Sequence, residues 1–443
     1  MARRGHPETI AGSSAAEIVE SVRRLIDSGG LAKGAALPPI RGLAAELGVN
    51  RNTVASAYAQ LAAAGLVETR RRGGTVVLGV PALDGEGRSA SRELVNLADG
   101  NPAIEFLPDP RAAFGTGYEP ALYGHPPINE SLAAWVDSEM APDVGPVPRG
   151  LVLTHGAADA VERLLGAHLA RGDAVVVEDP CFLSSIGTMR LNGYRSVPVP
   201  VDADGMTPDG LSRALEAGVR AVVCTPRAHN PTGASLTGER AEELRELLSR
   251  HPEVLVIEDD HFSAISARPY HRITPASAPR WALVRSMSKF LGPDLRLAFV
   301  LSDEDSAAQL SARLSSTAGW ISHALQHIVA TMLHDEGTAR LLRHARDSYA
   351  ERLRSLTGAL HEHGISLPPD RDGLNAWIPV GRGEKRLIDA LALRGWAVRG
   401  GSDFAVTERS AGALRVTTAN ISPQRAEAFA SDLAAVLRPK RGA

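Results

Sequence analysis

The chain contains 443 residues, of which 44% are apolar, and its net charge is −3. This length exceeds that of one ordinary domain, and the apolar fraction excludes a disordered or collagen-like chain. No apolar stretch approaches the roughly 20 residues that span a bilayer, and the N-terminus lacks the apolar core of a signal peptide, so we expect a cytoplasmic protein without a membrane partner. The two cysteines, Cys181 and Cys224, are too few for a disulfide framework or a cysteine-built metal site, and we expect no metal.

The charge is unevenly distributed along the chain. Residues 1–78 hold ten Arg and Lys against six Asp and Glu, whereas the remainder is net acidic. A basic N-terminal part suggests an acidic partner, and nucleic acid is the first candidate for a small domain.

The N-terminal part is predicted to contain three helices and a hairpin. Apolar residues recur at helical spacing in residues 14–28. A second helix is predicted after Pro39 and ends at Gly48, and Asn50 is a suitable N-cap for a third. Two helices joined by a tight glycine turn form a helix-turn-helix, and LVETRRRGGTVVL is typical of two short strands. Residues 1–78 are therefore predicted to form a winged helix-turn-helix.

The start of the third helix is polar and cationic, and this end enters the major groove in helix-turn-helix proteins. Arg51 and Asn52, followed by Thr53, could read guanine and adenine edges. Other cations are better suited to phosphates or the minor groove, namely Arg41, Arg70, Arg71 and Arg72. The alternative is a solvated basic surface, but the helix spacing, the turn glycine and the arginine-rich wing together favour binding to double-stranded DNA.

Residues 14–78 closely resemble the winged-helix domain of GntR-type bacterial regulators, through the run LPPIRGLAAELGVNRNTVASAYAQLAAAGLVETRRRGGTVVL. The resemblance implies that Arg41 and the segment from Arg51 to Thr53 contact operator DNA. Pro39 stands where Ser is more usual, so one possible contact between a hydroxyl and a phosphate is absent.

Residues 79–94 contain glycine, proline, serine and charge without periodicity, and we predict an interdomain linker. In residues 95–443, helical stretches alternate with apolar runs: GLVLTHG, DAVVVEDP, RSVPVPVD, RAVVCTPR, VLVIEDD, WALVRSMSK and LRLAFVLSD. Runs that are apolar on both faces predict a mostly parallel sheet covered on both sides, which is an α/β domain.

One loop carries groups suited to an aldehyde and a phosphate. SMSKFLGPDLRL follows an apolar strand and contains Ser286, Lys289 and Arg296. A desolvated lysine amine forms a Schiff base with an aldehyde, and a guanidinium beside hydroxyl groups binds a dianion. Together they point to pyridoxal 5′-phosphate (PLP). Most lysines are solvated surface charges, so this interpretation needs support from other segments.

Two segments supply partners for the cofactor ring. Asp259, with Asp260 as second choice, ends a buried strand and could hold a pyridine nitrogen protonated. In HNPTG, the Asn230 amide could face the ring oxygen, although Asn-Pro also occurs in structural turns.

Two more segments supply a phosphate site and a stacking ring. Where THGAAD leads from a strand into a helix, the N–H groups of Ala157 and Ala158 could bind the phosphate. Phe182, in EDPCF, could stack on the ring, although a lone Phe more often belongs to a core.

From about residue 95 to the C-terminus, these motifs in this order resemble the fold-type I aminotransferase domain. The resemblance implies that Lys289 holds the cofactor as a Schiff base, that Asp259 pairs with the pyridine nitrogen and that Asn230 meets the ring oxygen. It also implies that Phe182 stacks on the ring and that the phosphate is bound by Ser286, Arg296, Ala157 and Ala158.

Two further residues have roles only through this resemblance. Tyr123, in ALYGHPP, is similar to the tyrosine that reaches the phosphate in the neighbouring subunit. Arg415, in ALRVTTAN, is similar to the arginine that binds a substrate α-carboxylate. The resemblance therefore implies a homodimer.

The chain departs from the aminotransferase pattern at two places. His261-Phe262 stands where a tyrosine usually contacts the ring oxygen, so that contact is either made by His261 or missing. PPINESL stands where the family usually has a glycine-rich stretch that contains an arginine. This arginine is missing here, which suggests an altered substrate-facing rim.

A GntR-type domain fused to an aminotransferase-like domain is the architecture of MocR-type regulators, which implies a head-to-tail dimer. We expect a transcriptional regulator rather than an enzyme, with PLP or an amino-acid-type effector and a possible link to vitamin B6 metabolism. The alternative is an active aminotransferase that carries a DNA-binding domain. A dimerisation scaffold without cofactor is disfavoured, because Lys289, Asp259, Asn230 and Arg296 are all retained.

Overall fold

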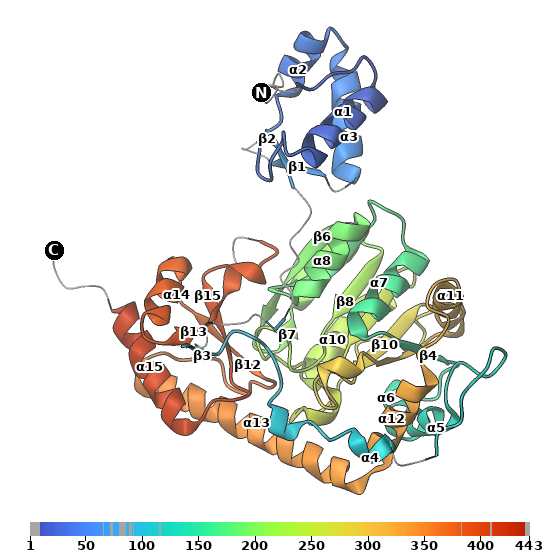
Figure 1. The fold of residues 1–443 in the computed structure, drawn as a ribbon, viewed down its shortest axis with the longest axis vertical. Coiled ribbons are helices and arrows are strands. Elements are labelled where there is room, and N and C mark those ends of the chain that lie inside the picture. Colours follow the sequence, from blue (N-terminus) through green and yellow to red (C-terminus); the bar gives the residue numbers. More distant parts are fainter. Residues whose placement is uncertain are drawn as a thin grey trace, which may run out of the picture. The chain divides into compact units, whose positions relative to one another are not determined.

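The computed structural model describes residues 9–64, 66–70, 74–78, 86–87, 91, 93–114, 117–381, 383–407 and 410–438. The chain divides into two compact units, one around the first 83 residues and one around the remainder, which we call the head and the body (Figure 1). Within the described ranges, no helix is long and apolar enough to cross a membrane. The structure describes the predicted linker only at residues 86, 87, 91, 93 and 94, and the domain limits remain predictions.

The head contains the predicted winged helix-turn-helix, with α1 Ala15–Asp27, α2 Ile40–Leu47, α3 Arg51–Ala63, β1 Val67–Arg70 and β2 Gly74–Val77. Asn50 caps α3, because its side chain accepts a hydrogen bond from the Asn52 N–H at 2.9 Å. Gly48 ends α2 with a φ of +66°, a left-handed conformation that favours glycine, and so forms the turn. The two strands pair in antiparallel fashion.

The core of the head fixes the direction of α3. Val22 of α1 and Val54 and Leu61 of α3 are fully buried in one cluster. The Tyr58 hydroxyl of α3 donates a hydrogen bond of 2.7 Å to the carbonyl of Pro38, just before α2. The first turn of α3 is thereby held at the surface of the head.

The body is built on an eight-stranded sheet in the order β4-β11-β10-β9-β8-β5-β6-β7. Its strands are β4 Gly150–Thr154, β5 Ala174–Asp179, β6 Arg195–Asp202, β7 Gly205–Met206, β8 Ala221–Cys224, β9 Leu255–Asp259, β10 Trp281–Ser286 and β11 Ala298–Ser302. The four central strands β5, β8, β9 and β10 are parallel, whereas β11 is antiparallel to β10 and β4. The prediction of a mostly parallel sheet is confirmed.

Helices cover both faces of this sheet, as the apolar runs predicted. Val222 belongs to a cluster with α9 Pro208–Glu216 and α10 Gly238–Ser249, and its neighbour Val223, on the opposite face, is also buried. Helix α7 Ala157–His168 packs on β4, β9, β10 and β11. The expectation that β6 is buried on both faces is wrong. This strand lies near the sheet edge, and only Val199 in it is buried.

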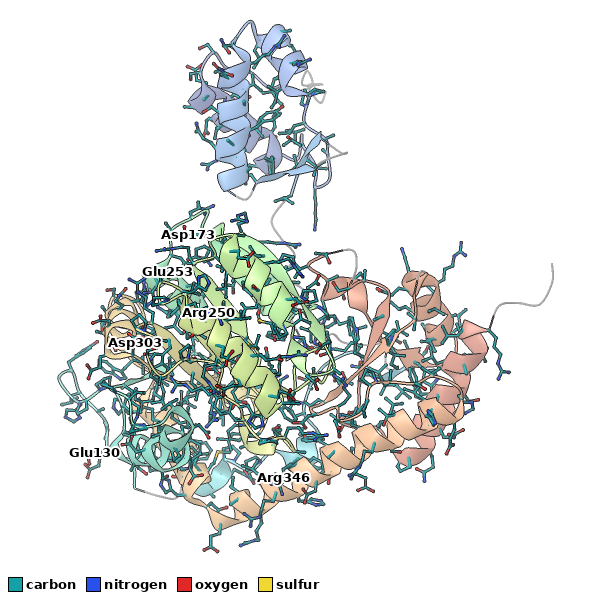
Figure 2. The ribbon with its side chains drawn as sticks, turned by 180° about the vertical axis from the view of Figure 1, so that it is seen from behind. Glu130, Asp173, Arg250, Glu253, Asp303 and Arg346 are labelled. Carbon is teal, nitrogen blue, oxygen red and sulfur yellow. The ribbon has the colours of Figure 1, made fainter. Side chains whose placement is uncertain are left out.

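Other helices and 3-10 turns surround the sheet. They are η1 Ile104–Phe106, α4 Arg111–Phe114, α5 Glu130–Glu139, α6 Ala141–Val144, α8 Leu183–Asn192, η2 Ser263–Ile265, η3 Pro293–Leu295, α11 Glu304–Ser315, α12 His323–His334 and α13 Glu336–Glu362. Asp303, labelled in Figure 2, caps α11 and accepts a 2.8 Å hydrogen bond from the Trp281 N–H. This contact anchors the start of β10.

A smaller lobe is formed by the C-terminal part of the body. Its elements are β12 Asn375–Pro379, α14 Glu384–Ala392, β13 Trp396–Ala397, β14 Arg399–Gly400, η4 Gly401–Asp403, β15 Ala413–Thr417 and α15 Pro423–Leu437. Strand β3 Val95–Asn96, from the start of the body, pairs with β13. The Gly100 N–H donates a 3.0 Å hydrogen bond to the Thr417 hydroxyl. The chain around residue 100 therefore lies beside the end of β15.

Candidate functional site

The predicted cofactor residues gather at the carboxyl ends of the central strands. Asp259 ends β9, and Lys289 follows β10 in the next loop. Phe182 and Asn230 follow β5 and β8. Because parallel strands present their carboxyl ends at the same sheet edge, the fold brings these residues together, and ligands commonly bind at such an edge in α/β proteins.

Lys289 is a desolvated amine at this edge. Its Nζ donates a hydrogen bond of 2.9 Å to the Gly100 carbonyl. Burial lowers the pKa of Lys289; the charge of Glu86 opposes this effect, and that of Arg415 adds to it. A lysine with a lowered pKa is more often deprotonated, and only the deprotonated amine is a nucleophile.

The neighbouring carboxyl groups Asp259 and Asp260 have contrasting surroundings. Asp260 accepts two hydrogen bonds of 2.8 Å from Arg227 and one of 2.7 Å from Arg285. Burial alone would raise the pKa of Asp260, but the two guanidinium groups hold it below its usual value. Oδ1 of Asp259 is buried without a hydrogen-bond partner among the described residues. Burial, together with the charge of Asp260, raises the pKa of Asp259 to about 7.

The predicted phosphate-binding residues lie where β4 meets α7. The helix begins at Ala157, so the N–H groups of Ala157 and Ala158 have no partner within the helix. Arg296 approaches the same turn and donates a 3.1 Å hydrogen bond to the His155 carbonyl. Gly156 makes this approach possible, because a Cβ there would lie 2.8 Å from the Arg296 guanidinium. Free N–H groups at a helix N-terminus beside a guanidinium suit a phosphate.

Ser286 lies at the end of β10 and is buried. Its hydroxyl oxygen accepts a 3.2 Å hydrogen bond from the Ser288 N–H. The hydroxyl proton is still available to an acceptor, since this bond uses only the oxygen.

The rings of Phe182 and His261 lie nearly parallel, at 11° with their centroids 6.5 Å apart. Burial, and secondarily the charge of Lys289, lowers the pKa of His261 to about 4. His261 is therefore neutral at pH 7 and has one ring nitrogen that donates and one that accepts. The next residue, Phe262, is 2% exposed and belongs to the core.

Asn230 and Arg415 both donate hydrogen bonds to Glu86, a residue for which the sequence predicted no role. Oε1 of Glu86 accepts hydrogen bonds from Nδ2 of Asn230 at 2.8 Å and from Nη1 of Arg415 at 2.5 Å. Burial would raise the pKa of Glu86, but the charges of Arg415 and Lys289 hold it below its usual value. A single glutamate in a glycine- and serine-rich linker carries no motif, so no sequence signal identified it.

Two predictions concern the rim of the site, and both remain predictions. Tyr123 is 93% exposed and its ring packs edge-on against Trp320, with centroids 5.4 Å apart; its predicted role in a neighbouring subunit remains a prediction. In PPINESL, Asn129 caps α5 by accepting a 2.8 Å hydrogen bond from the Ser131 N–H. This stretch therefore has a structural role as a helix start.

The predicted DNA-contacting residues of the head lie at the starts of α2 and α3. Arg41 is exposed in the first turn of α2, and Arg51 and Asn52 are exposed in the first turn of α3, where Thr53 is half-buried. The wing arginines fall elsewhere: Arg70 ends β1, its side chain is not described, and Arg71 and Arg72 lie outside the described residues.

Two protein families match the chain. Residues 14–77 match the bacterial regulatory proteins of the gntR family. Residues 110–433 match the family of class I and II aminotransferases. The two matches correspond to the head and to most of the body.

Two regulatory proteins are similar to the chain over most of its length. The vitamin B6 salvage pathway transcriptional repressor PtsJ of Salmonella typhimurium is 44% identical over 426 residues, which cover 96% of this chain and 98% of that protein. The probable rhizopine catabolism regulatory protein MocR of Rhizobium meliloti is 26% identical, over 78% of this chain and 77% of that protein.

Solved aminotransferase structures share the fold of the body. The kynurenine aminotransferase of Pyrococcus horikoshii superposes with a TM-score of 0.70 and 20% identity, over 80% of this chain and 93% of that chain. The fold class expected from the sequence is confirmed by this likeness and by the family matches. With a GntR domain ahead of an aminotransferase domain and a 44% identical regulator along nearly its whole length, the chain belongs to the MocR-type DNA-binding transcriptional regulators of the GntR superfamily.

Proposed function

We propose that this regulator binds operator DNA through the start of α3, binds PLP in the body and uses PLP itself as its signal. The observation that carries the proposal is the set of groups around Lys289, with the unpartnered Asp259 oxygen and the predicted phosphate-binding residues beside Gly156. The repressor PtsJ is named for vitamin B6 salvage, which supports a role in vitamin B6 metabolism for this chain too.

The residues of the site fit PLP on independent grounds. No described residue donates a hydrogen bond to Oδ1 of Asp259, and a protonated pyridine nitrogen would supply that donor. The first turn of α7 and Arg296 offer N–H groups and a positive charge to a phosphate. When bound, PLP supplies an aldehyde for a lysine amine and an electron-withdrawing ring.

The chain's own residues would divide the work of holding this cofactor. Lys289 would bond to the aldehyde carbon, and the raised pKa of Asp259 would fall on pairing with a positive charge. Neutral His261 would contact the ring oxygen in place of the usual tyrosine. Asn230 would share that task, and Phe182 would shield one face of the ring from water.

Active transamination is the second candidate, favoured by the same desolvated Lys289 and by the buried cation Arg415, which is 0% exposed. Multiple turnovers with an amino acid and a keto acid would establish it. We favour regulation without turnover, because Arg415 is already bound to the carboxylate of Glu86.

A homodimer completes the proposal. Phe114 and Leu122 are each 70% exposed, and Tyr123 is 93% exposed in the same stretch. Large apolar side chains exposed within ten residues of one another in the chain are candidates for an interaction surface. A second copy would cover them, and Tyr123 would then reach the phosphate site of the partner.

Lys289→Ala should abolish covalent capture of PLP. Lys289 is one of four lysines in the chain, and its burial favours it as a nucleophile. After incubation with PLP and reduction with borohydride, mass spectrometry of peptides should find the phosphopyridoxyl group on Lys289 in the wild type. The matched control Lys385→Ala, at an exposed position, should still be labelled at Lys289. Labelling of Lys289→Ala to the wild-type extent would refute the assignment.

Asp259→Asn should stabilise the cofactor-free protein and weaken PLP binding. Since the pKa of Asp259 is raised to about 7 in the folded state from 3.8, ionisation of this group lowers the free energy of unfolding as the pH rises from about 4 to 7. The gain in melting temperature from Asp259→Asn should therefore be larger at pH 8 than at pH 5.

Asp260→Asn is the matched control for this substitution. The pKa of Asp260 is lowered in the folded state, so its ionised form stabilises the fold at pH 8. Removing one member of a buried ion pair costs about 3–5 kcal/mol. The melting temperature of Asp260→Asn should fall at pH 8. A fall of similar size in both variants would contradict the different roles given to the two carboxyl groups.

Arg51→Ala should weaken specific DNA binding by about 1–3 kcal/mol. The test is a binding titration against a site selected from random-sequence DNA and against unrelated DNA. Arg41→Ala, at a position suited to phosphate contact, should weaken binding to both DNAs equally. It should also reduce the slope of the logarithm of the binding constant against the logarithm of salt concentration by about one. Equal losses on both DNAs for Arg51→Ala would show that Arg51 does not read bases.

A further inference from the structure

We propose that Glu86 is a built-in carboxylate ligand that occupies the amino-acid carboxylate position on Arg415 and restricts the site to PLP. The proposal rests on the proposed function, because it names what the PLP site excludes. Its evidence is the set of contacts made by Glu86.

Glu86 is bound as a free carboxylate ligand would be. One oxygen, Oε1, accepts hydrogen bonds from Nη1 of Arg415 at 2.5 Å and from Nδ2 of Asn230 at 2.8 Å. Arg415 is 0% exposed, and its Nη2 is held by the Ala98 carbonyl at 2.7 Å. The guanidinium is therefore fixed in direction, and Glu86 contacts it through Nη1, which also lies 3.4 Å from Oδ1 of Asn230.

The second carboxylate oxygen fits a space left by a glycine. A Cβ on Gly100 would lie 2.2 Å from Oε2 of Glu86, so only glycine allows the carboxylate this position. Oε2 of Glu86 and Nε of Arg415 are both buried without a hydrogen-bond partner among the described residues. The Gly87 N–H donates a 2.7 Å hydrogen bond to the Asp99 carbonyl, which anchors the backbone beside Glu86.

The charges make this position exclusive. Glu86 is bound to Arg415, and the charges of Arg415 and Lys289 both hold its pKa low. A second carboxylate beside Glu86 would add an unpaired negative charge in a buried site, which is costly. An amino acid must therefore displace Glu86, and a ligand within the same chain competes at a high effective concentration.

This arrangement separates the two effector classes. An amino acid needs a cation for its carboxylate, whereas the phosphate of PLP would be bound by the first turn of α7 and by Arg296. PLP can therefore bind without competing for Arg415. Glu86 also follows the head by only a few residues of the predicted linker, so its contact ties the linker to the PLP site.

The first arm of the experiment uses the cofactor-free protein, so that it does not depend on PLP binding. Glu86→Ala leaves Arg415 without its carboxylate partner, and the carboxylate of acetate should take the place of that partner. We expect acetate, compared with chloride at equal ionic strength, to raise the melting temperature of Glu86→Ala but not of the wild type. An equal response of both proteins to acetate would overturn the proposal.

The second arm uses PLP-loaded protein titrated with L-alanine, L-glutamate and L-lysine while the absorbance of the cofactor is recorded. Glu86→Ala should respond to at least one amino acid at a concentration about tenfold or more below that needed by the wild type. The isosteric variant Glu86→Gln keeps the side-chain shape and removes the charge, and it should also gain sensitivity. Identical titrations for all three proteins would refute the role of Glu86. Failure of the wild type to bind PLP would instead refute the proposed function, and the acetate arm would still decide the role of Glu86.

Discussion

The site depends on the buried carboxylate of Asp260 and the two guanidinium groups that neutralise it. Arg227 follows β8, Asp260 follows β9 and Arg285 lies in β10, so the three charges join the ends of three parallel strands. Asp143 of α6 pairs with the outer side of Arg285. The ring of Tyr270 lies under both guanidinium groups, at 5.7 and 5.1 Å from its centroid. Buried charges are tolerated only when they are paired in this way.

Two functional groups depend on that network. Because Asp260 takes both guanidinium groups, its neighbour Asp259 is left with a buried oxygen that has no hydrogen-bond partner in the part of the chain that the structure describes. The loop that carries Lys289 begins directly after β10, and the Asp260 N–H bonds the Val284 carbonyl of that strand at 2.9 Å. An uncompensated acid and a desolvated amine are thus held at the same sheet edge. Such a pair lowers the stability of the ligand-free protein, and it favours binding of a ligand with complementary groups.

Much of this arrangement could be predicted from the sequence, because it follows from strong local patterns. Helical spacing, the Asn50 cap and the Gly48 turn specify the helices of the head. Apolar runs with polar ends specify the strands and place Lys289 and Asp259 at their carboxyl ends. These features depend on residues close together in the chain.

Other features depend on contacts between distant segments and had no sequence signal. Asp259 is the first choice from the sequence and Asp260 the second, but the cause of their difference lies in the fold, since only the folded chain brings Arg227 and Arg285 to Asp260. The contact of Glu86 with Arg415 joins residues more than three hundred positions apart. The burial of β6 was overestimated, because its place near the sheet edge is a property of the topology.

In the proposed mechanism, occupancy of the body by PLP changes the affinity of the head for DNA. PLP can shift the operator affinity only as far as its own affinities for the DNA-binding state and the other state of the protein differ. By linkage, operator DNA must shift the affinity for PLP by the same factor. The most direct test is a titration of operator binding against PLP, paired with a titration of PLP binding with and without operator. We predict equal shift factors in the two titrations, each of about fivefold or more. An operator affinity that stays constant from zero to saturating PLP would contradict the account.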